Sequence, residues 1–302
     1  MNIAIFGGAG FIGRHLARKL LSLGHKIVVI DNLCVEPAEP LPKGVAFVKA
    51  NTRDLVIRAA LNHGPEVIYW LQAKQGYKNS WKTYAHENIE PVYNFFRAVE
   101  LNQTRIKKII LASSQAVYEP GLDRDEGSIA SPPSVYGMTK LQQEHAFRLF
   151  CNIYNIQLIA LRYSIVLGAG QSMKSTESGV LRNWYRSYKR GERPKIYGDG
   201  KQIRDFVSVS DVTAFNARAL NLEFSRIMNV YGFRTTILGL FKIFRSITKC
   251  RNAEILGTDI RPGGEFDMTS TTFYNVRKPV VGLRRQVKDF VDFWEKKPYN
   301  PR

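Results

Sequence analysis

The stretch that decides the fold is Asn2-Ile3-Ala4-Ile5-Phe6-Gly7-Gly8-Ala9-Gly10-Phe11-Ile12-Gly13, in which a short apolar run meets spaced glycines. The run over 2–6 predicts a buried strand, and the apolar residues of 11–23 repeat at the spacing of an amphipathic helix. Glycines between a strand and a helix let the main chain approach a pyrophosphate, which the first N–H groups of the helix can bind. The segment predicts a dinucleotide-binding turn, and an ordinary glycine-rich turn is the alternative.

The next predicted strand, 26–31, ends at Asp31, 18 residues beyond Gly13. A carboxylate at this place can accept hydrogen bonds from an adenosine ribose and would repel a 2′-phosphate. Asp31 therefore favours NAD over NADP as the cofactor. Arg14 leaves room for the opposite preference, because its guanidinium can face a phosphate.

Outward from this unit, short apolar runs alternate with segments of helical period, the pattern of parallel strands joined by crossover helices. It predicts an α/β fold with a doubly wound parallel (Rossmann) sheet over 1–165. Residues 166–302 are expected to form a smaller mixed α/β substrate lobe, with some segments that return to the first domain. The predicted strands are 2–6, 26–31, 45–49, 67–71, 107–113 and 156–162, and the predicted helices are 11–23, 54–62, 83–102 and 134–154.

Composition leaves the class of partner open. The 302 residues carry 44 Lys and Arg against 26 Asp and Glu, a net charge of +18, and the excess is mainly in residues 151–302. Such a surplus suits nucleic acid, an anionic membrane or an anionic small ligand, but no nucleic-acid motif accompanies it. Three widely spaced cysteines and five scattered histidines suggest neither a disulfide framework nor a metal site. Without a signal peptide or a membrane span, a soluble cytoplasmic protein is expected.

A second motif is Tyr136-Gly137-Met138-Thr139-Lys140, at the start of a predicted helix. Residues four apart share a helix face, so the Lys140 ammonium can lower the pKa of the Tyr136 phenol toward neutrality and make it a usable acid or base. A solvated helix face is the alternative for this spacing. The strand before it ends in Ser113-Ser114, at the sheet edge where ligands bind in open α/β folds.

Several blocks in order give the chain a family resemblance over nearly its whole length. It resembles extended short-chain dehydrogenase/reductases of the NAD-dependent epimerase/dehydratase family. The blocks are the glycine turn, Asp31-Asn32-Leu33, Ser113-Ser114-Gln115-Ala116-Val117-Tyr118, Tyr136 with Lys140, Leu161-Arg162-Tyr163, residues 198–211 from Gly198-Asp199-Gly200 onward, and Arg261-Pro262-Gly263.

The resemblance implies a catalytic set of Ser114, Tyr136 and Lys140, with Asn88 in a structural role. It implies a nucleotide-diphosphate sugar as substrate, held by Ser114, Tyr136, Arg204 and Arg261, and a homodimer formed through 83–102 and 134–154. The residues that it implies for NAD are Gly7, Gly10, Phe11, Ile12, Gly13, Asp31, Asn32, Asn51, Thr52, Leu71 and Lys140.

Two departures from the family pattern concern the ligands. Ile165 replaces an Asn that helps to bind the diphosphate, so substrate anchoring is expected to differ. Trp70-Leu71-Gln72-Ala73 stands where the family reads His-Leu-Ala-Ala, so we expect a bulkier or more polar wall beside the nicotinamide.

The two residues after Ser114 restrict the reactions that the chain can be expected to catalyse. Family dehydratases place an Asp-Glu pair there, because elimination needs its own acid and base, whereas this chain has Gln115 and Ala116. The remaining groups support reversible oxidation of one carbinol. We expect a NAD-dependent epimerase acting at C4 of a UDP-hexose; the alternatives are an NAD(P)H-dependent 4-ketoreductase or dehydrogenase, and a catalytically silent NAD or sugar-nucleotide binding protein.

Overall fold

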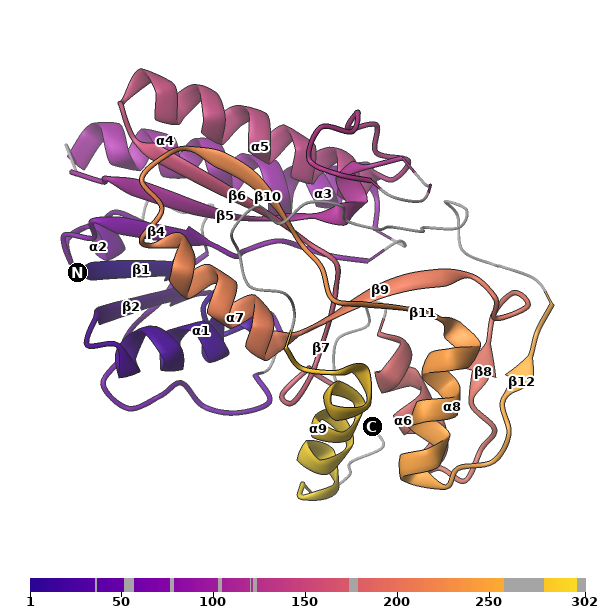
Figure 1. The fold of residues 1–302 in the computed structure, drawn as a ribbon. Helices are drawn as coiled ribbons and strands as arrows, with labels where there is room; N and C mark the ends of the chain where they lie inside the picture. The colour runs from indigo at the N-terminus through magenta and orange to yellow at the C-terminus, as the bar shows by residue number, and fades with distance from the viewer. Residues whose placement is uncertain are drawn as a thin grey trace.

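The computed structural model describes residues 1–35, 37–51, 57–76, 79–102, 105–119, 121, 124–173, 179–257 and 280–297 (Figure 1). In chain order its elements are β1 (Asn2–Phe6), α1 (Phe11–Ser22), β2 (Lys26–Asp31), β3 (Ala46–Lys49), α2 (Ile57–Leu61), β4 (Val67–Trp70), α3 (Trp81–Tyr84), the π-helix η1 (Ala85–Ile89), α4 (Glu90–Asn102), β5 (Lys108–Ser114), the 3-10 turn η2 (Gln115–Val117), α5 (Val135–Ile153), β6 (Gln157–Tyr163), β7 (Ile165–Leu167), α6 (Val180–Lys189), β8 (Lys195–Ile196), β9 (Ile203–Ser208), α7 (Val209–Ala219), β10 (Arg226–Val230), β11 (Phe233–Thr236), α8 (Ile237–Thr248), β12 (Glu254–Ile255) and α9 (Leu283–Glu295).

Seven parallel strands form the central sheet, in the order β10-β6-β5-β4-β1-β2-β3. All six predicted strands are in it, each within one residue of its expected ends, which confirms the doubly wound fold. The strand order reverses between β1 and β4, where a doubly wound sheet opens a crevice at the carboxyl ends of its strands. The seventh strand, β10, comes from far along the chain and pairs with β6 at the edge of the sheet.

Helices cover both faces of this sheet, with α1 and α7 on one side and α4 and α5 on the other (Figure 1). An aromatic cluster fills the α4/α5 side, where the Trp70 ring lies 5.0 Å from Phe6, 5.3 Å from Phe95 and 5.4 Å from Phe147. Trp70 is completely buried there. The expectation that it forms a bulkier cofactor wall is therefore wrong, because the last position of β4 turns its side chain into the core.

The predicted helix over 83–102 is three consecutive segments, α3, η1 and α4. Of the predicted helix over 54–62, the described part is α2, and residues 54–56 lie outside the described ranges. The second lobe holds a small mixed sheet, in which β9 runs parallel to β7 and antiparallel to β11. Helices α6, α8 and α9 bury their apolar faces against it. Within the described ranges no helix is long and apolar enough to cross a membrane, and no cluster of His, Cys, Asp and Glu suits a metal ion.

Candidate active site

The turn after β1 is so tight that several of its glycines leave no room for a side chain. A Cβ on Gly13 would lie 2.5 Å from the Cα of Gly8, and a Cβ on Gly7, whose φ is +76°, would lie 2.8 Å from the Cα of Gln72. At the start of α1, Gly10 gives no side-chain cap and the first turn has no acidic residue. The main-chain N–H groups there suit a pyrophosphate, so this turn fits the phosphates of a dinucleotide.

Asp31 ends β2 beside this turn. Its carboxylate accepts hydrogen bonds from the main-chain N–H of Ala9 at 3.0 Å and of Leu33 at 2.8 Å. Burial raises the pKa of Asp31, and these hydrogen bonds oppose the rise. Arg14 does not face outward to a 2′-phosphate: it is buried and donates to the carbonyls of Ala9 and Gly170, each at 3.0 Å. The possibility that Arg14 softens the preference for NAD is therefore not supported.

Five other residues predicted to bind the cofactor lie along the same edge of the sheet. Phe11 and Ile12 open α1, Asn32 follows β2, Asn51 follows the end of β3 and Leu71 follows β4. All five are half-buried. They share this edge because the carboxyl ends of parallel strands point the same way, and their contacts with a cofactor remain predictions.

Ser114 and Tyr136 border one close contact between a strand end and a helix start. Ser114 ends β5, and its hydroxyl accepts a hydrogen bond from the N–H of Ala116 at 3.2 Å. Tyr136 lies in the first turn of α5, where the Ser134 hydroxyl accepts from the N–H of Gly137 at 3.1 Å. A Cβ on Gly137 would lie 2.0 Å from the carbonyl oxygen of Ala116. Glycine is therefore required for α5 to start directly against the turn that follows Ser114.

Lys140 lies one helical turn beyond Tyr136 and is buried. Its ammonium donates to the carbonyl of Ala112 on β5 at 2.8 Å and to the side-chain oxygen of Gln143 at 3.1 Å. Burial lowers the pKa of Lys140 to about 7, although the charge of Glu144 acts to raise it. An ammonium has three N–H donors, so these two acceptors leave one for a ligand in the site.

A buried ion pair stands behind this group. Arg162 on β6 donates from Nε and Nη2 to the two oxygens of Glu144, at 2.9 and 2.7 Å, and from Nη1 to the Tyr118 hydroxyl at 2.8 Å. The Ser113 hydroxyl also donates to Glu144, and the Tyr118 hydroxyl donates to Asn229 on β10 at 2.8 Å. Burial disfavours the Arg162 cation, but Glu144 outweighs this and raises its pKa. The network ties β5, α5, β6 and β10 together directly behind Ser114.

Asn88 joins the segment after β4 to α5. It is fully buried in η1, and its side-chain oxygen accepts from the N–H of Lys74 at 2.6 Å. Its side-chain nitrogen donates to the Lys74 carbonyl and to the Thr139 hydroxyl, each at 3.0 Å. These contacts agree with the structural role expected for Asn88.

Gln72 replaces a small residue of the family pattern, and its side chain contacts the π-helix η1. Pro91 has no N–H, so the carbonyl of Glu87 lacks the donor that an α-helix supplies four residues on. The Gln72 side-chain nitrogen donates to that carbonyl at 2.6 Å. Gln72 thus closes an interruption of the helix by a contact that a small residue cannot make.

The residues predicted to bind the substrate diphosphate come later in the sequence than Ser114, Tyr136 and Lys140. Ile165 opens β7, which follows β6 of the central sheet and pairs with β9 of the small sheet. Arg204 is buried on β9, and its Nη1 donates to the carbonyl of Ile203 at 2.8 Å. Its role as a phosphate ligand remains a prediction. Thr52 and Arg261 lie outside the described residues.

Comparison with known proteins decides the family. The model of the NAD-dependent epimerase/dehydratase family matches residues 3–230. The chain belongs to this family. It is 34% identical over 249 residues to a UDP-glucose 4-epimerase homologue of Methanocaldococcus jannaschii, covering 80% of this chain and 81% of that protein. Family membership confirms the predicted fold and the NAD cofactor.

Other relatives show how widely the family varies in its reactions. The UDP-glucose 4-epimerase of Thermotoga maritima, solved with UDP-glucose, superimposes with a TM-score of 0.90 at 27% identity, covering 98% of this chain and 99% of that one. A UDP-N-acetyl-alpha-D-glucosaminuronate decarboxylase of Bacillus cytotoxicus is 28% identical over 233 residues, which cover 72% of this chain and 70% of that protein. Family membership alone therefore leaves the reaction to be argued from the site.

Sequence reasoning missed the supporting roles of three side chains around the candidate catalytic group: Gln143, Glu144, and Arg162, which was noted only as part of the block Leu161-Arg162-Tyr163. A signal for two of them was present, because Gln143 and Glu144 follow Lys140 by three and four residues and so lie on its side of the helix. The partner of Glu144 was less visible, since Arg162 reaches it from β6.

Proposed function

We propose that this protein is a nucleotide-sugar 4-epimerase that retains its NAD and acts on a UDP-hexose of the glucose or galactose type. The observation that carries the proposal is the set of groups at the end of β5 and the start of α5. Ser114, Tyr136 and Lys140 are the acid–base groups there, and Gln115 and Ala116 follow Ser114 where an elimination would need an acid and a base. This set suits reversible oxidation of one carbinol.

The three residues have different tasks in that chemistry. Ser114 holds the C4 hydroxyl, and Tyr136 accepts its proton and later returns it. Lys140 keeps the phenol acidic and binds the nicotinamide ribose through its remaining N–H. Bound NAD supplies the acceptor and the donor of the C4 hydride. Because Tyr136 would keep the proton in the site, a 4-keto sugar could turn over there and be reduced on its other face.

The support for a UDP-sugar comes from the relatives and from charge. The Thermotoga enzyme was solved with UDP-glucose, and the Methanocaldococcus relative is also a UDP-glucose 4-epimerase homologue. Arg204, buried on β9, suits a diphosphate because a guanidinium binds phosphate in a bidentate manner and keeps its charge when desolvated. The basic excess of residues 151–302 would attract such an anion.

A panel experiment tests the function. The purified protein is incubated with UDP-, dTDP-, GDP- and CDP-hexoses without added nicotinamide, and the products are separated by anion-exchange chromatography. We expect the C4 epimer of a UDP-hexose to appear. Product that forms only with stoichiometric NAD(P)H would instead identify a ketoreductase or dehydrogenase, and the absence of any product would favour a binding protein.

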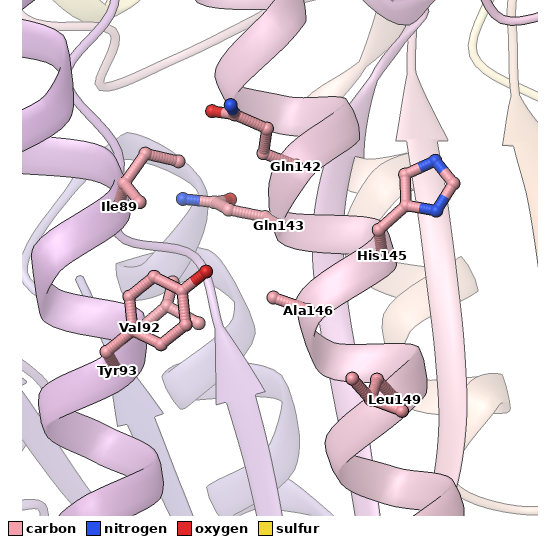
Figure 2. A pocket seen from close by; sticks show the side chains of 8 residues that line it. All are labelled: Ile89, Val92, Tyr93, Gln142, Gln143, His145, Ala146 and Leu149. Atoms are coloured by element: carbon pink, nitrogen blue, oxygen red, sulfur yellow. The ribbon is translucent and has the colours of Figure 1, made fainter.

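We also propose that two copies pair through α4 and α5. A groove of about 420 Å³ runs between these helices and is largely apolar, with Ile89, Val92, Tyr93, Ala146 and Leu149 among its lining (Figure 2). Tyr93 and Leu149 are 59% and 64% exposed, which is unusual for large apolar side chains on one face. Sedimentation analysis should find a dimer that Leu149→Glu dissociates; a monomeric wild type would contradict this.

A further inference from the structure

We propose that Gln143 is a positioning residue for the reaction: it holds the Lys140 ammonium toward the site and separates it from the groove between α4 and α5. This inference rests on the proposed function, because it concerns how Lys140 serves Tyr136. Gln143 stands apart from the set of Ser114, Tyr136 and Lys140, and its role follows from its contacts.

Both ends of the Gln143 amide are occupied. Its Oε1 accepts from the Lys140 ammonium at 3.1 Å, and its Nε2 donates to the main-chain carbonyl of Asn88 at 2.7 Å. The side chain is only 1% exposed. Asn88 is itself fixed by its bonds to Lys74 and Thr139. The bridge therefore runs from the ammonium to the main-chain oxygen of a residue held by further hydrogen bonds, and it determines where the Gln143 oxygen lies.

The same side chain closes one wall of the groove. Figure 2 shows Gln143 reaching from α5 toward the helix that carries Ile89, beside the apolar lining. Lys140 is buried behind it and lines no part of this groove. An amide is neutral and does not exchange a proton as a carboxyl or an imidazole does. Gln143 can thus bind the ammonium without offering it a proton path to the groove.

The neutral contact with Gln143 matters for the pKa of Lys140 because the acidic group that acts on Lys140 is shared with another cation. Glu144 is the acidic group that acts on Lys140, and Arg162 binds both of its oxygens. Of the other elements packed on α5, α3 brings Tyr84, and η1 brings Glu87 and His86, the latter exposed and paired with Glu90. Because burial already lowers the pKa of Lys140, losing the Gln143 oxygen would lower it further.

Two substitutions should move this pKa in opposite directions. Gln143→Leu removes the acceptor at similar volume, so Lys140 should lose its proton at a pH lower by about half to one unit. Gln143→Glu places a carboxylate against the ammonium, so the pKa should rise. A carboxylate would raise the pKa of Lys140 from any close position, so the fall expected in Gln143→Leu tests the native oxygen, and the rise expected in Gln143→Glu tests the contact of residue 143 with the ammonium. Gln157→Leu is the matched control, because Gln157 also donates to a main-chain carbonyl at 2.7 Å, that of Leu222, but lies at the start of β6.

The measurement is the titration of the Lys140 13Cε resonance in the purified protein with its NAD and without nucleotide sugar, assigned by its loss in Lys140→Met, together with kcat and KM against pH for a UDP-hexose. We expect opposite shifts of the midpoint in the two Gln143 variants, a high-pH limb of kcat that moves with each, and a kcat at pH 8 about three- to tenfold lower in Gln143→Leu at an unchanged KM.

Unchanged midpoints and profiles in both Gln143 variants, or equal effects of Gln157→Leu, would overturn the inference. If Gln143→Leu does not fold, Gln143→Glu still tests the contact, because an unchanged Lys140 midpoint would show that residue 143 does not meet the ammonium. If the wild type turns over no nucleotide sugar, the proposed function fails, while the titration of Lys140 still tests Gln143.

Discussion

Adding a single methyl group at Gly137 should separate catalysis from stability. In Gly137→Ala the new Cβ would lie 2.0 Å from the carbonyl oxygen of Ala116, whereas real Cβ contacts essentially never fall below 3.0 Å. The first turn of α5 and the turn after Ser114 must therefore move apart by about 1 Å. This displacement falls between Ser114 and Tyr136, the two groups that we expect to act on one hydroxyl.

The expected loss of activity is large. A misplacement of about 1 Å can lower a rate about 100-fold, which corresponds to about 2.7 kcal/mol of transition-state stabilisation. The free energy of unfolding should change less. Overpacking costs about 1–3 kcal/mol, but alanine is favoured over glycine within a helix by about 1 kcal/mol, so a net loss of about 0–2 kcal/mol is expected.

The assay measures kcat/KM for epimerisation of a UDP-hexose and, separately, urea unfolding. Gly282→Ala is the control, because a Cβ at Gly282 meets nothing within 4 Å and the residue has an ordinary φ of −56°. It should keep wild-type kcat/KM. A Gly137→Ala enzyme with kcat/KM within about threefold of the wild type would refute the reasoning that this contact sets the geometry of Ser114 and Tyr136.

Three further predictions concern the groups around this contact. Tyr136→Phe should abolish turnover and leave the affinity for NAD, measured by calorimetry, unchanged; residual turnover near the wild-type rate would remove Tyr136 from its role. Arg162→Met should lower the free energy of unfolding by about 3–5 kcal/mol because it leaves Glu144 buried and unpaired, and adding Glu144→Leu should restore most of the loss in urea titrations; a further loss in the double variant would contradict this. Lys140 has a folded pKa of about 7 against an ordinary value of 10.5. Above pH 7 the unfolded chain therefore holds the additional proton, and the free energy of unfolding should rise by about 1.4 kcal/mol per pH unit up to about pH 10, relative to Lys140→Met. Parallel pH curves for the two proteins would speak against a buried Lys140.

Local sequence patterns were sufficient to predict most of the fold. Each of the six predicted strands is a short apolar run between turn residues, and each lies in the sheet within a residue of its expected ends. The seventh strand, β10, was not predicted as one. Its residues 226–230 are a short run far from the other strands in sequence, and they join the sheet only by pairing with β6. Such a non-local pairing leaves little trace in local sequence.

The same limit applies to the candidate site. Glycine spacing placed the turn after β1, and helical spacing placed Lys140 one turn after Tyr136. Trp70 was misjudged because a motif comparison fixes a position along a strand but not the face to which the side chain points. The hydrogen bond from Gln143 to the Asn88 carbonyl could not be predicted either. Asn88 belongs to a π-helix, which the periodicity of 83–102 does not distinguish from an α-helix.

The most direct test of the account follows the hydrogen at C4. UDP-[4-2H]glucose is incubated with the enzyme in ordinary water without added nicotinamide, and the epimer is analysed by NMR and mass spectrometry. Transient oxidation with return of the same hydride predicts a product that keeps its deuterium at C4. Replacement of that deuterium by solvent hydrogen, or a product that has lost the elements of water, would contradict the proposed epimerase.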